Sequence, residues 1–367
     1  MKFGGTSLRS EDSRSKAVEH IRNQFELGNK IVVVVSAMGR KGEPYATDTL
    51  ISLMKKIGEP VNPVELDSVI SIGETLSASL FSHLLNQNNL PAESFTGSKA
   101  GILTDNNPGN AEIIKIDPTK IKFSIDSGKI PVIAGFQGVN KDGEVRTLGR
   151  GGSDTSAVAL GSALNAEFIE IFSDVDGIAN CDPNKIPEAS FIEKISVEQV
   201  LNMANEGSKV IHPRAVKASM KRKTKIILRN TFSNAKGTLI YHKYNQTNIN
   251  QTVLSHRENM VLIEIKSKDN LKKLFPEIIL IDNRRCVLKD DIYLDDRIND
   301  LQKMYGKVKK EIGWATISLI FEKKEGKNYI FPDTEIIFSS DTIVRYLVEE
   351  KKLLTTLRLL VAHYKMI

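Results

Sequence analysis

The sequence predicts an α/β fold, in which a mostly parallel sheet lies between layers of helices, followed by a smaller α+β region. Continuous β-branched runs such as Ile31–Val35 are typical of strands covered on both faces. These runs alternate with helical patterns as far as about residue 241, an order that predicts a parallel sheet. The runs end in glycine-rich or polar turns, and open α/β sheets bind ligands at the carboxyl ends of their strands.

A chain of 367 residues predicts two or three domains. The polar segment Asn245–Gln251 is the expected linker, which puts the domains at residues 1–244 and 252–367. The composition, 41% hydrophobic and 26% charged, is typical of a soluble globular protein. Because no apolar run is long enough to span a bilayer and no signal segment stands at the start, we expect no membrane contact and a cytoplasmic protein. The two cysteines, Cys181 and Cys286, form neither a metal-ligand pattern nor a disulfide framework.

The net charge of +6 comes mostly from scattered residues. The one dense basic run is Lys217–Lys225, and no aromatic residue is interleaved with it. A solvated helix end explains such a run better than a nucleic-acid patch does. We therefore expect no nucleic-acid partner.

The start of the chain predicts a phosphate-binding turn. Gly4 and Gly5, followed by Thr6 and Ser7, would cradle a phosphate ahead of the helix predicted over 11–27. Lys2 is a candidate phosphate ligand at this turn. Because only three residues precede the glycines, the first strand is expected to be short.

Ser36 follows the Ile31–Val35 strand, at the end where a ligand is expected. Thr47 and Asp48 are then expected to cap a helix. A longer helical pattern runs from about Val64 to Leu90, with an interruption near Gly73. Glu74 comes directly after that glycine, and from the residues alone it is interpreted as a surface carboxylate.

A strand is predicted over Ile130–Gly138, and the stretch Arg146–Ala157 then joins a glycine-rich turn to the start of a helix. Its glycines let the backbone approach a ligand, and helix N-termini favour anions. Arg150 can hold a carboxylate or phosphate through two hydrogen bonds. An ordinary loop before a helix is the alternative for this stretch alone. The glycines and the expected capping side chains are Gly149, Gly151, Gly152, Ser153, Asp154 and Thr155.

The next strand, Phe168–Phe172, ends in the polar turn Ser173–Gly177, and the loop beyond it closes at Asp182. Pro213 is expected to begin a helix, and His212 before it is interpreted as structural. Further elements are a helix over 196–206 and strands over 225–228 and 238–241.

The tail predicts an α+β regulatory or oligomerisation module, because its strands and helices are shorter and follow a different order. The expected strands cover 261–265, 277–281, 314–320 and 335–338, with a helix over about 295–310 and a final strand and helix within 342–364.

Taken together, these stretches resemble the aspartokinases, a family of the amino-acid kinase superfamily. The resemblance covers residues 1 to about 241 and gains its specificity from eight motifs in the family's order. The loop 38–48 is most similar to that of monofunctional enzymes of the lysine and diaminopimelate branch. The motifs are Lys2–Ser7, Val34–Met38, Ser71–Glu74, Gly135–Gly138, Thr147–Asp154, Ser173–Gly177, Gly207–Arg214 and Arg229–Phe232.

The resemblance implies transfer of the γ-phosphoryl group of ATP to the β-carboxylate of L-aspartate, a first step toward lysine, threonine and methionine. A carboxylate nucleophile has a pKa of about 4 and needs no general base at neutral pH. Catalysis then depends on positioning and positive charge. ATP and Mg²⁺ are the implied cofactors, with Mg²⁺ held mainly by the ATP phosphates and no protein metal ligand expected. Neither a Walker motif nor a protein-kinase catalytic loop is present.

The resemblance also implies the residues of the site. Lys2 would meet the transferring phosphoryl group, Asp154 would orient Lys2 and Lys209, and Lys209 would approach the phosphates. Arg150 would hold the α-carboxylate of aspartate and Glu74 its ammonium group. The further implied substrate contacts are Ser36, Thr47, Gly152 and Ser153. The implied nucleotide contacts are Lys2, Phe3, Gly4, Gly5, Ser173, Asp174, Ala179, Asp182, Asn184 and Lys209.

Three departures from the family pattern bear on function. The strand before Lys2 is almost absent. Asn184 stands where the family usually has arginine and Ala179 where it has an aromatic or polar residue, so weaker ATP binding is expected. The tail resembles paired ACT domains in shortened form, because residues 322–327 leave no room for a helix. We expect weak or absent inhibition by amino-acid effectors, with the tail still forming a homodimer.

Two alternatives stay open at this point. The chain could be a kinase for another amino-acid carboxylate, such as glutamate, which a substrate panel would distinguish. It could instead be a catalytically weak ACT-type protein that binds a partner, in which case it would fold and dimerise without aspartate-dependent ATP turnover.

Overall fold

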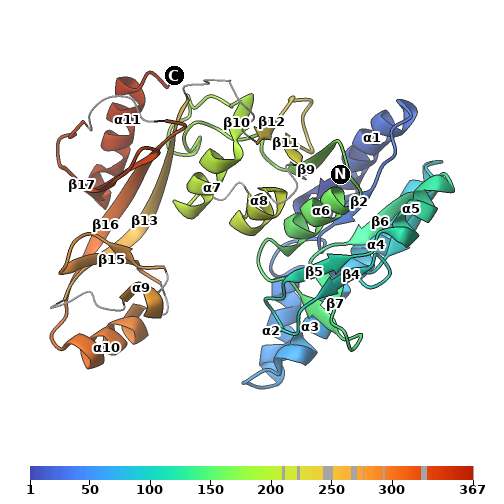
Figure 1. The fold of residues 1–367 in the computed structure, drawn as a ribbon, viewed down its shortest axis with the longest axis horizontal. Helices are drawn as coiled ribbons and strands as arrows, with labels where there is room; N and C mark the ends of the chain where they lie inside the picture. The colour runs from blue at the N-terminus through green and yellow to red at the C-terminus, as the bar shows by residue number, and fades with distance from the viewer. Residues whose placement is uncertain are drawn as a thin grey trace. The chain divides into compact units, whose positions relative to one another are not determined.

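The computed structural model of the chain forms two compact units (Figure 1). The first unit comprises Met1–Ile178, Phe191–Val197 and Val210–Tyr244, and the second comprises Ala179–Ser190, Glu198–Lys209 and Asn245–Ile367. Most of the predicted linker lies outside the described residues, so the predicted domain boundaries stay predictions. The structure describes residues 1–208, 211–220, 224–242, 251–265, 271–275, 277–291, 294–323 and 329–366.

The first unit is built on an eight-stranded sheet with the order β10-β12-β11-β9-β1-β2-β6-β3. Its neighbouring strands run parallel except for the antiparallel pair β11 and β12. The predicted mostly parallel sheet is therefore confirmed. The strands are β1 Lys2–Phe3, β2 Val33–Val35, β3 Ala92–Phe95, β6 Ile130–Ala134, β9 Phe168–Ser173, β10 Lys194–Ser196, β11 Lys225–Asn230 and β12 Thr238–Tyr241.

Helices cover both faces of this sheet (Figure 1). Phe3 packs in one hydrophobic core with α1 Glu11–Glu26 and α4 Ile72–Gln87. Lys2 points to the opposite face, because successive strand side chains alternate, and there it forms an ion pair with Asp154 of α6 Gly152–Ala163. The short strand β1 thus lies between a buried apolar layer and a charged pair.

Local signals account for several of the helix starts in this unit. Ser10 caps α1 through a hydrogen bond from the Ser13 N–H. Pro63 begins α3 Pro63–Ile70 after the cap Asn62, and the predicted interruption before Gly73 separates α3 from α4. Pro213 begins α8 Pro213–Met220, as predicted. The remaining short helices are η1 Thr6–Leu8 and α5 Thr119–Asp126.

Two predicted caps are wrong. Thr47 is the first residue of α2 Thr47–Ile57, and the cap position holds Ala46, whose side chain cannot accept a hydrogen bond. Gly151, in the left-handed conformation with φ of 71°, occupies the cap position of α6. Ser153, Asp154 and Thr155 therefore lie within the first turn of α6, which leaves the Asp154 carboxylate available to Lys2.

A second, four-stranded sheet in the first unit was not predicted. Its order is β5-β4-β7-β8, and each strand has only three or four residues. The predicted strand 130–138 is split, because β6 ends at Ala134 and β7 begins at Gln137. These strands are β4 Ile102–Thr104, β5 Ile113–Ile116, β7 Gln137–Val139 and β8 Val145–Thr147.

The second unit contains a six-stranded antiparallel sheet with the order β14-β15-β13-β16-β18-β17. Its first half, β13-α9-β14-β15-α10-β16, is a complete βαββαβ arrangement. Its second half, β17-β18-α11, has no helix between β16 and β17 among the described residues. The elements are β13 Thr252–Glu264, α9 Leu271–Leu274, β14 Ile279–Leu280, β15 Arg285–Lys289, α10 Leu294–Tyr305, β16 Lys309–Phe321, β17 Thr334–Ser339, β18 Ile343–Glu349, η2 Glu350–Lys352 and α11 Leu353–His363.

The α+β character predicted for the tail is confirmed, but several elements differ from the prediction. Helix α9 and strand β15 are absent from the prediction, and with them the βαββαβ arrangement. The predicted helix over 295–310 ends at Tyr305, because Gly306 follows with φ of 78° and β16 already begins at Lys309.

Two segments that precede the tail in sequence belong to this second unit. Glu206, which follows α7 Val197–Asn205, is buried and accepts hydrogen bonds from the Ser318 hydroxyl at 2.7 Å and the Arg345 Nε at 2.8 Å. Burial alone would raise the pKa of Glu206, but the bonds from Arg345 and Ser318 outweigh burial and lower it. The Asn180 carbonyl accepts a hydrogen bond from the Leu254 N–H at 2.7 Å.

Among the described residues, no helix combines the length and apolarity that crossing a membrane would need.

Candidate active site

Several predicted site residues lie at one edge of the main sheet. Lys2 is in β1, Ser36 directly follows β2, and Ser173 is the last residue of β9. These three strands are parallel neighbours, so their carboxyl ends meet. The structure therefore brings the predicted phosphate turn, substrate residue and nucleotide turn to the same edge.

The ammonium group of Lys2 is held in place by Asp154. The Lys2 Nζ lies 2.7 Å from the Asp154 Oδ1, and only 8% of Lys2 is exposed. A Cβ atom added to Gly4 would lie 3.6 Å from the Lys2 Nζ. The absence of a side chain at Gly4 thus keeps open the space next to the ammonium group, where an anionic group can approach.

Two glycines allow the turns around this ammonium group to pack closely. A Cβ atom on Gly5 would lie 2.7 Å from the Ala37 carbonyl oxygen, and one on Gly73 would lie 2.8 Å from the Ala37 Cβ. Both distances are too short for a real Cβ atom. The phosphate turn and the start of α4 therefore both meet the turn after β2, which brings Glu74 next to it.

Glu74 is buried, and its interpretation as a surface carboxylate is wrong. Only 2% of the residue is exposed, and its Oε1 accepts a hydrogen bond from the Ala37 N–H at 3.1 Å. Burial raises the pKa of Glu74 to about 8, although the Ala37 N–H and the charge of Lys2 act in the opposite direction.

Unpaired polar atoms around Glu74 indicate a place for a ligand. The Glu74 Oε2 is buried and has no hydrogen-bond partner among the described residues. The hydroxyl of Ser77, one helical turn further along α4, is buried and unpaired in the same way. Buried polar groups without partners are costly in proteins, so these two acceptors are well suited to a donor group from a substrate. The sequence analysis did not assign Ser77 to the site; its spacing of three residues from Glu74 was the available signal.

The remaining predicted substrate residues lie on three elements. Arg150 is exposed at the tip of the turn before α6. Gly152 begins α6, and Ser153 packs so closely on Gly135 that a Cβ there would lie 2.9 Å from the Ser153 Cβ. Thr47 is half-buried at the start of α2. Among the described residues, neither Arg150 nor Thr47 forms a hydrogen bond or ion pair with Glu74, so their shared role stays a prediction.

His212 packs against the same turn. A Cβ atom on Gly151 would lie 2.3 Å from the Cβ and Cγ of His212. Burial, together with the nearby charge of Arg214, lowers the pKa of His212. The contact with Gly151 agrees with the structural role that the sequence predicts for this histidine.

The predicted nucleotide residues are divided between the two units. In the first unit, Asp174 follows β9 and forms an ion pair of 3.3 Å with Arg40. In the second unit, the Asp182 Oδ1 accepts hydrogen bonds from the Asn184 N–H at 2.9 Å and side-chain amide at 3.0 Å, and Ala179 is buried. Lys209 lies outside the described residues. The roles of these residues stay predictions.

A supporting residue that the sequence analysis did not assign is Thr231, in the loop after β11. Its hydroxyl lies 2.6 Å from the Ser7 hydroxyl, and its N–H donates to the Ser173 carbonyl at 2.9 Å. The Thr231 carbonyl lies 3.1 Å from the His20 Nε2. Thr231 thus joins the phosphate turn to the nucleotide turn, and its place in the motif Arg229–Phe232 was the only signal.

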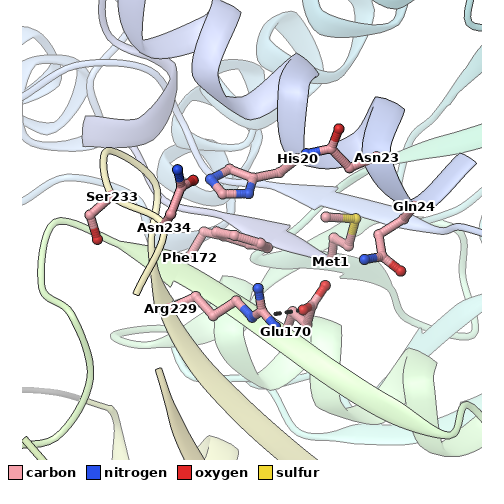
Figure 2. Close-up of a pocket in the computed structure, with 9 residues that line it drawn as sticks. All are labelled: Met1, His20, Asn23, Gln24, Glu170, Phe172, Arg229, Ser233 and Asn234. Carbon is pink, nitrogen blue, oxygen red and sulfur yellow. Dashed lines mark ion pairs between the residues drawn. The ribbon is translucent and has the colours of Figure 1, made fainter. Parts of the chain in front are cut away.

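A separate cavity lies on the α1 side of the sheet (Figure 2). It has a volume of about 120 Å³, and Arg229 and Glu170, which form an ion pair of 2.9 Å, are among the residues that line it. Phe172 also lines it, and this side chain packs with Phe3 on the face opposite Lys2. The cavity is therefore not part of the site around Lys2 and Asp154.

Among the described residues, no cluster of three or more His, Cys, Asp or Glu side chains could hold a metal ion.

Comparisons with known proteins identify the family. The sequence model of the "Amino acid kinase family" matches residues 1–230. Aspartokinase 1 of Bacillus subtilis is 44% identical over 239 residues, which are 65% of this chain and 59% of that protein. Aspartokinase 2 of the same organism is 33% identical over 344 residues, which are 94% of this chain and 83% of that protein.

Solved structures show the same fold. A crystal structure of Escherichia coli aspartokinase III, in complex with aspartate and ADP, matches with a TM-score of 0.74 and 21% identity, covering 96% of each chain. The present chain spans about 59% of the length of the curated relative that it matches at 44% identity.

Proposed function

Because the chain belongs to the amino acid kinase family and, within it, to the aspartokinases, we propose that it transfers the γ-phosphoryl group of ATP to the β-carboxylate of L-aspartate. The observation that carries this proposal is the arrangement of Lys2, Asp154 and Glu74 at the carboxyl ends of parallel strands. It combines a fixed cation with a buried acid that lacks a partner for one oxygen. A site that phosphorylates an amino acid needs both groups, the cation for the phosphoryl group and the acid for the substrate ammonium.

Lys2 is the group that lowers the activation barrier to phosphoryl transfer. Its ammonium attracts the transferring phosphoryl group and offsets the repulsion between the anionic nucleophile and ATP. Asp154 holds this ammonium at 2.7 Å and orients it, and no proton has to be removed from the substrate carboxylate. The close packing around Gly5 and Gly73 keeps these groups in place before substrates bind.

Glu74 and Arg150 bind the ammonium and α-carboxylate groups of the substrate. Binding of the substrate ammonium at the Glu74 Oε2 supplies the missing partner of that buried oxygen and favours the ionised carboxylate. Arg150 binds the α-carboxylate from the exposed turn before α6. Ser36, Thr47, Gly152 and Ser153 line the same substrate, and Ser77 adds a second acceptor near Glu74.

ATP fits the phosphate turn, because Gly4 leaves room next to the Lys2 ammonium and Gly5 allows the turn to close against Ala37. Mg²⁺ is held mainly by the ATP phosphates and supplies further positive charge for the transfer. Phe3, Ser173, Asp174, Ala179, Asp182, Asn184 and Lys209 are the remaining proposed nucleotide contacts. The side-chain amide of Asn184 is already bonded to Asp182, which supports a weaker nucleotide contact than an arginine would make.

The direct test is ATP turnover with magnesium, with and without L-aspartate, with the acyl phosphate trapped by hydroxylamine. Aspartate-dependent hydroxamate is the expected result. L-glutamate and D-aspartate serve as the substrate controls. Hydroxamate that forms with glutamate but not with aspartate would assign a different amino-acid kinase, and none with either from folded protein would contradict a kinase.

We further propose that the tail forms a homodimer and that lysine, threonine and diaminopimelate inhibit weakly or not at all. The absence of a helix between β16 and β17 among the described residues supports the weak inhibition, because one of the two ACT-like halves is incomplete. We expect millimolar amounts of each amino acid to change the hydroxamate rate less than about twofold. A clear fall in rate at micromolar concentrations would contradict the prediction.

A further inference from the structure

We propose that Asp67 and Arg214, which have no assigned role in the site, are positioning residues that clamp the turn carrying Arg150 and thereby set the affinity for aspartate. The inference rests on the proposed function for its substrate, but the clamp itself is a structural feature. Neither residue is a catalytic residue in this proposal, since both act through the backbone of the turn.

Asp67, which lies in α3, holds the residue at the start of the turn that carries Arg150. It is completely buried, and its two carboxylate oxygens accept hydrogen bonds from the Gly109 N–H at 3.0 and 3.1 Å. The same carboxylate accepts bonds from the Thr147 N–H at 3.1 Å and the Thr147 hydroxyl at 2.5 Å. Hydrogen bonds to an ionised acceptor are stronger than neutral ones, so Asp67 fixes the last residue of β8 to the segment around Gly109.

From α8, Arg214 holds the next residue at the same end of the turn, Leu148. Its Nη1 donates to the Asn110 Oδ1 at 2.7 Å and to the Leu148 carbonyl, and its Nη2 donates to the Ala111 carbonyl at 2.8 Å. The Ala111 N–H in turn donates to the Thr147 carbonyl at 2.9 Å. The planar guanidinium therefore ties the segment 109–111 to the residue that directly precedes the glycine turn.

The turn that follows the anchored residues Thr147 and Leu148 has little room to move. A Cβ atom on Gly149 would lie 2.8 Å from the Gly109 carbonyl oxygen, and one on Gly151 would contact His212. Both glycines have positive φ, of 72° and 71°, a conformation that other residues rarely adopt. Arg150 between them is exposed, so its backbone position is determined by its anchored neighbours rather than by contacts of its own side chain.

This arrangement predicts that weakening the clamp lowers aspartate affinity and leaves ATP binding unchanged. Arg150 would remain present and charged, but its guanidinium would no longer be held where the α-carboxylate binds. Aspartate affinity would fall, whereas Lys2, Asp154 and the phosphate turn, which Asp67 and Arg214 do not contact, would bind ATP as before. Small displacements of a binding group cost up to about a hundredfold in enzymes, and we expect about tenfold here.

The test compares wild type with Arg214→Met, which keeps the side-chain length but removes the donors, and with Asp67→Asn, which turns one acceptor into a donor facing N–H groups. Arg22→Met is the matched control. Arg22 lies in α1, outside the clamp, and it also donates to a backbone carbonyl, that of Asn88 at 2.9 Å. Hydrogen exchange followed by mass spectrometry should show faster exchange of the peptide 146–155 in the two clamp variants alone.

Kinetics then test whether the clamp acts through Arg150. We expect the KM for aspartate to rise about tenfold in both clamp variants, with the KM for ATP changing less than about twofold. In an Arg150→Met background, Arg214→Met should add little, because the group that it positions is gone. Additive effects, or an equal rise in both KM values, would overturn the role in aspartate binding.

Unchanged exchange of the peptide 146–155 in both clamp variants would overturn the clamp whatever the activity. A wild-type protein without aspartate-dependent hydroxamate would instead contradict the proposed function, and with it the substrate part of the inference, while the exchange result would still decide whether the clamp exists.

Discussion

Replacing Lys2 by methionine is expected to lower kcat for aspartate-dependent hydroxamate about a thousandfold. The change removes a buried ammonium at the sheet edge where β1 and β9 end, next to Gly4, which has no side chain. Loss of a single preorganised charge or donor in a phosphoryl- or acyl-transfer site costs about 10²- to 10⁵-fold. In its proposed role, Lys2 stabilises the transition state more than the ground state, so the KM for aspartate should change much less than kcat.

Two control variants separate this effect from a general loss of charge. Lys30→Met removes another lysine–aspartate pair of the first unit, with Asp126 at 3.0 Å, but that pair is exposed, and its loss should leave kcat unchanged. Asp154→Asn should reduce kcat by a smaller factor, about ten- to a hundredfold, because the ammonium is kept but less well oriented. In Lys2→Met, the further change Asp154→Asn should have little effect. A Lys2→Met protein that folds and keeps more than about a tenth of the wild-type kcat would rule out the role assigned to Lys2.

Replacing Glu74 by glutamine is expected to raise the KM for aspartate about a hundredfold, because a neutral amide cannot form the buried charge pair with the substrate ammonium.

The pH dependence of wild-type kcat/KM for aspartate should report the ionisation of Glu74. Since burial raises the pKa of Glu74 to about 8, kcat/KM for aspartate should rise with pH and level off above about pH 8. In Glu74→Gln this rise should be lost, and a variant that keeps the wild-type profile would contradict the assignment.

Stability measurements provide the control for Glu74→Gln, because folding and substrate binding place opposite demands on this residue. The folded-state pKa is raised above the ordinary value of 4.5, so between about pH 4.5 and 8 the unfolded chain gives up a proton that the folded protein keeps. The free energy of unfolding therefore falls as pH rises through this window. Glutamine removes the penalty, and the variant should melt about 5 °C higher than wild type at pH 9 but not at pH 4. A variant that is less stable than wild type at pH 9 would show that Glu74 is structural.

Much of the first unit was predictable because its signals are local. The run Ile31–Val35, the helix over 11–27 and the proline at 213 each indicate their element from neighbouring residues. The four-stranded sheet was missed for the same reason, since strands of three or four residues such as Ile102–Thr104 show no alternation long enough to read. The two wrong helix caps, at Thr47 and Ser153, arose where a positive-φ glycine or a preceding alanine takes the position that a polar side chain usually takes.

The site residues also divide into those with a local sequence signal and those without one. Lys2, Gly4 and the turn after Phe172 stand out in the sequence, because a glycine-rich or polar turn after a strand is a local pattern. Glu74 does not, because its burial depends on Gly73 meeting Ala37, a residue 37 positions away from Glu74. Nothing near Glu74 in the sequence indicates that its pKa is raised.

The sequence by itself determined the order of strands and helices and the turns at which chemistry is expected, because both depend on residues next to one another in the chain. Only the tertiary structure decided which polar side chains are buried and what they hold. Asp67 contacts Thr147 across 80 residues of sequence, and Arg214 reaches Leu148 from another helix. The energy of such groups depends on the partners that folding brings to them, since a buried charge is stable only where several donors meet it.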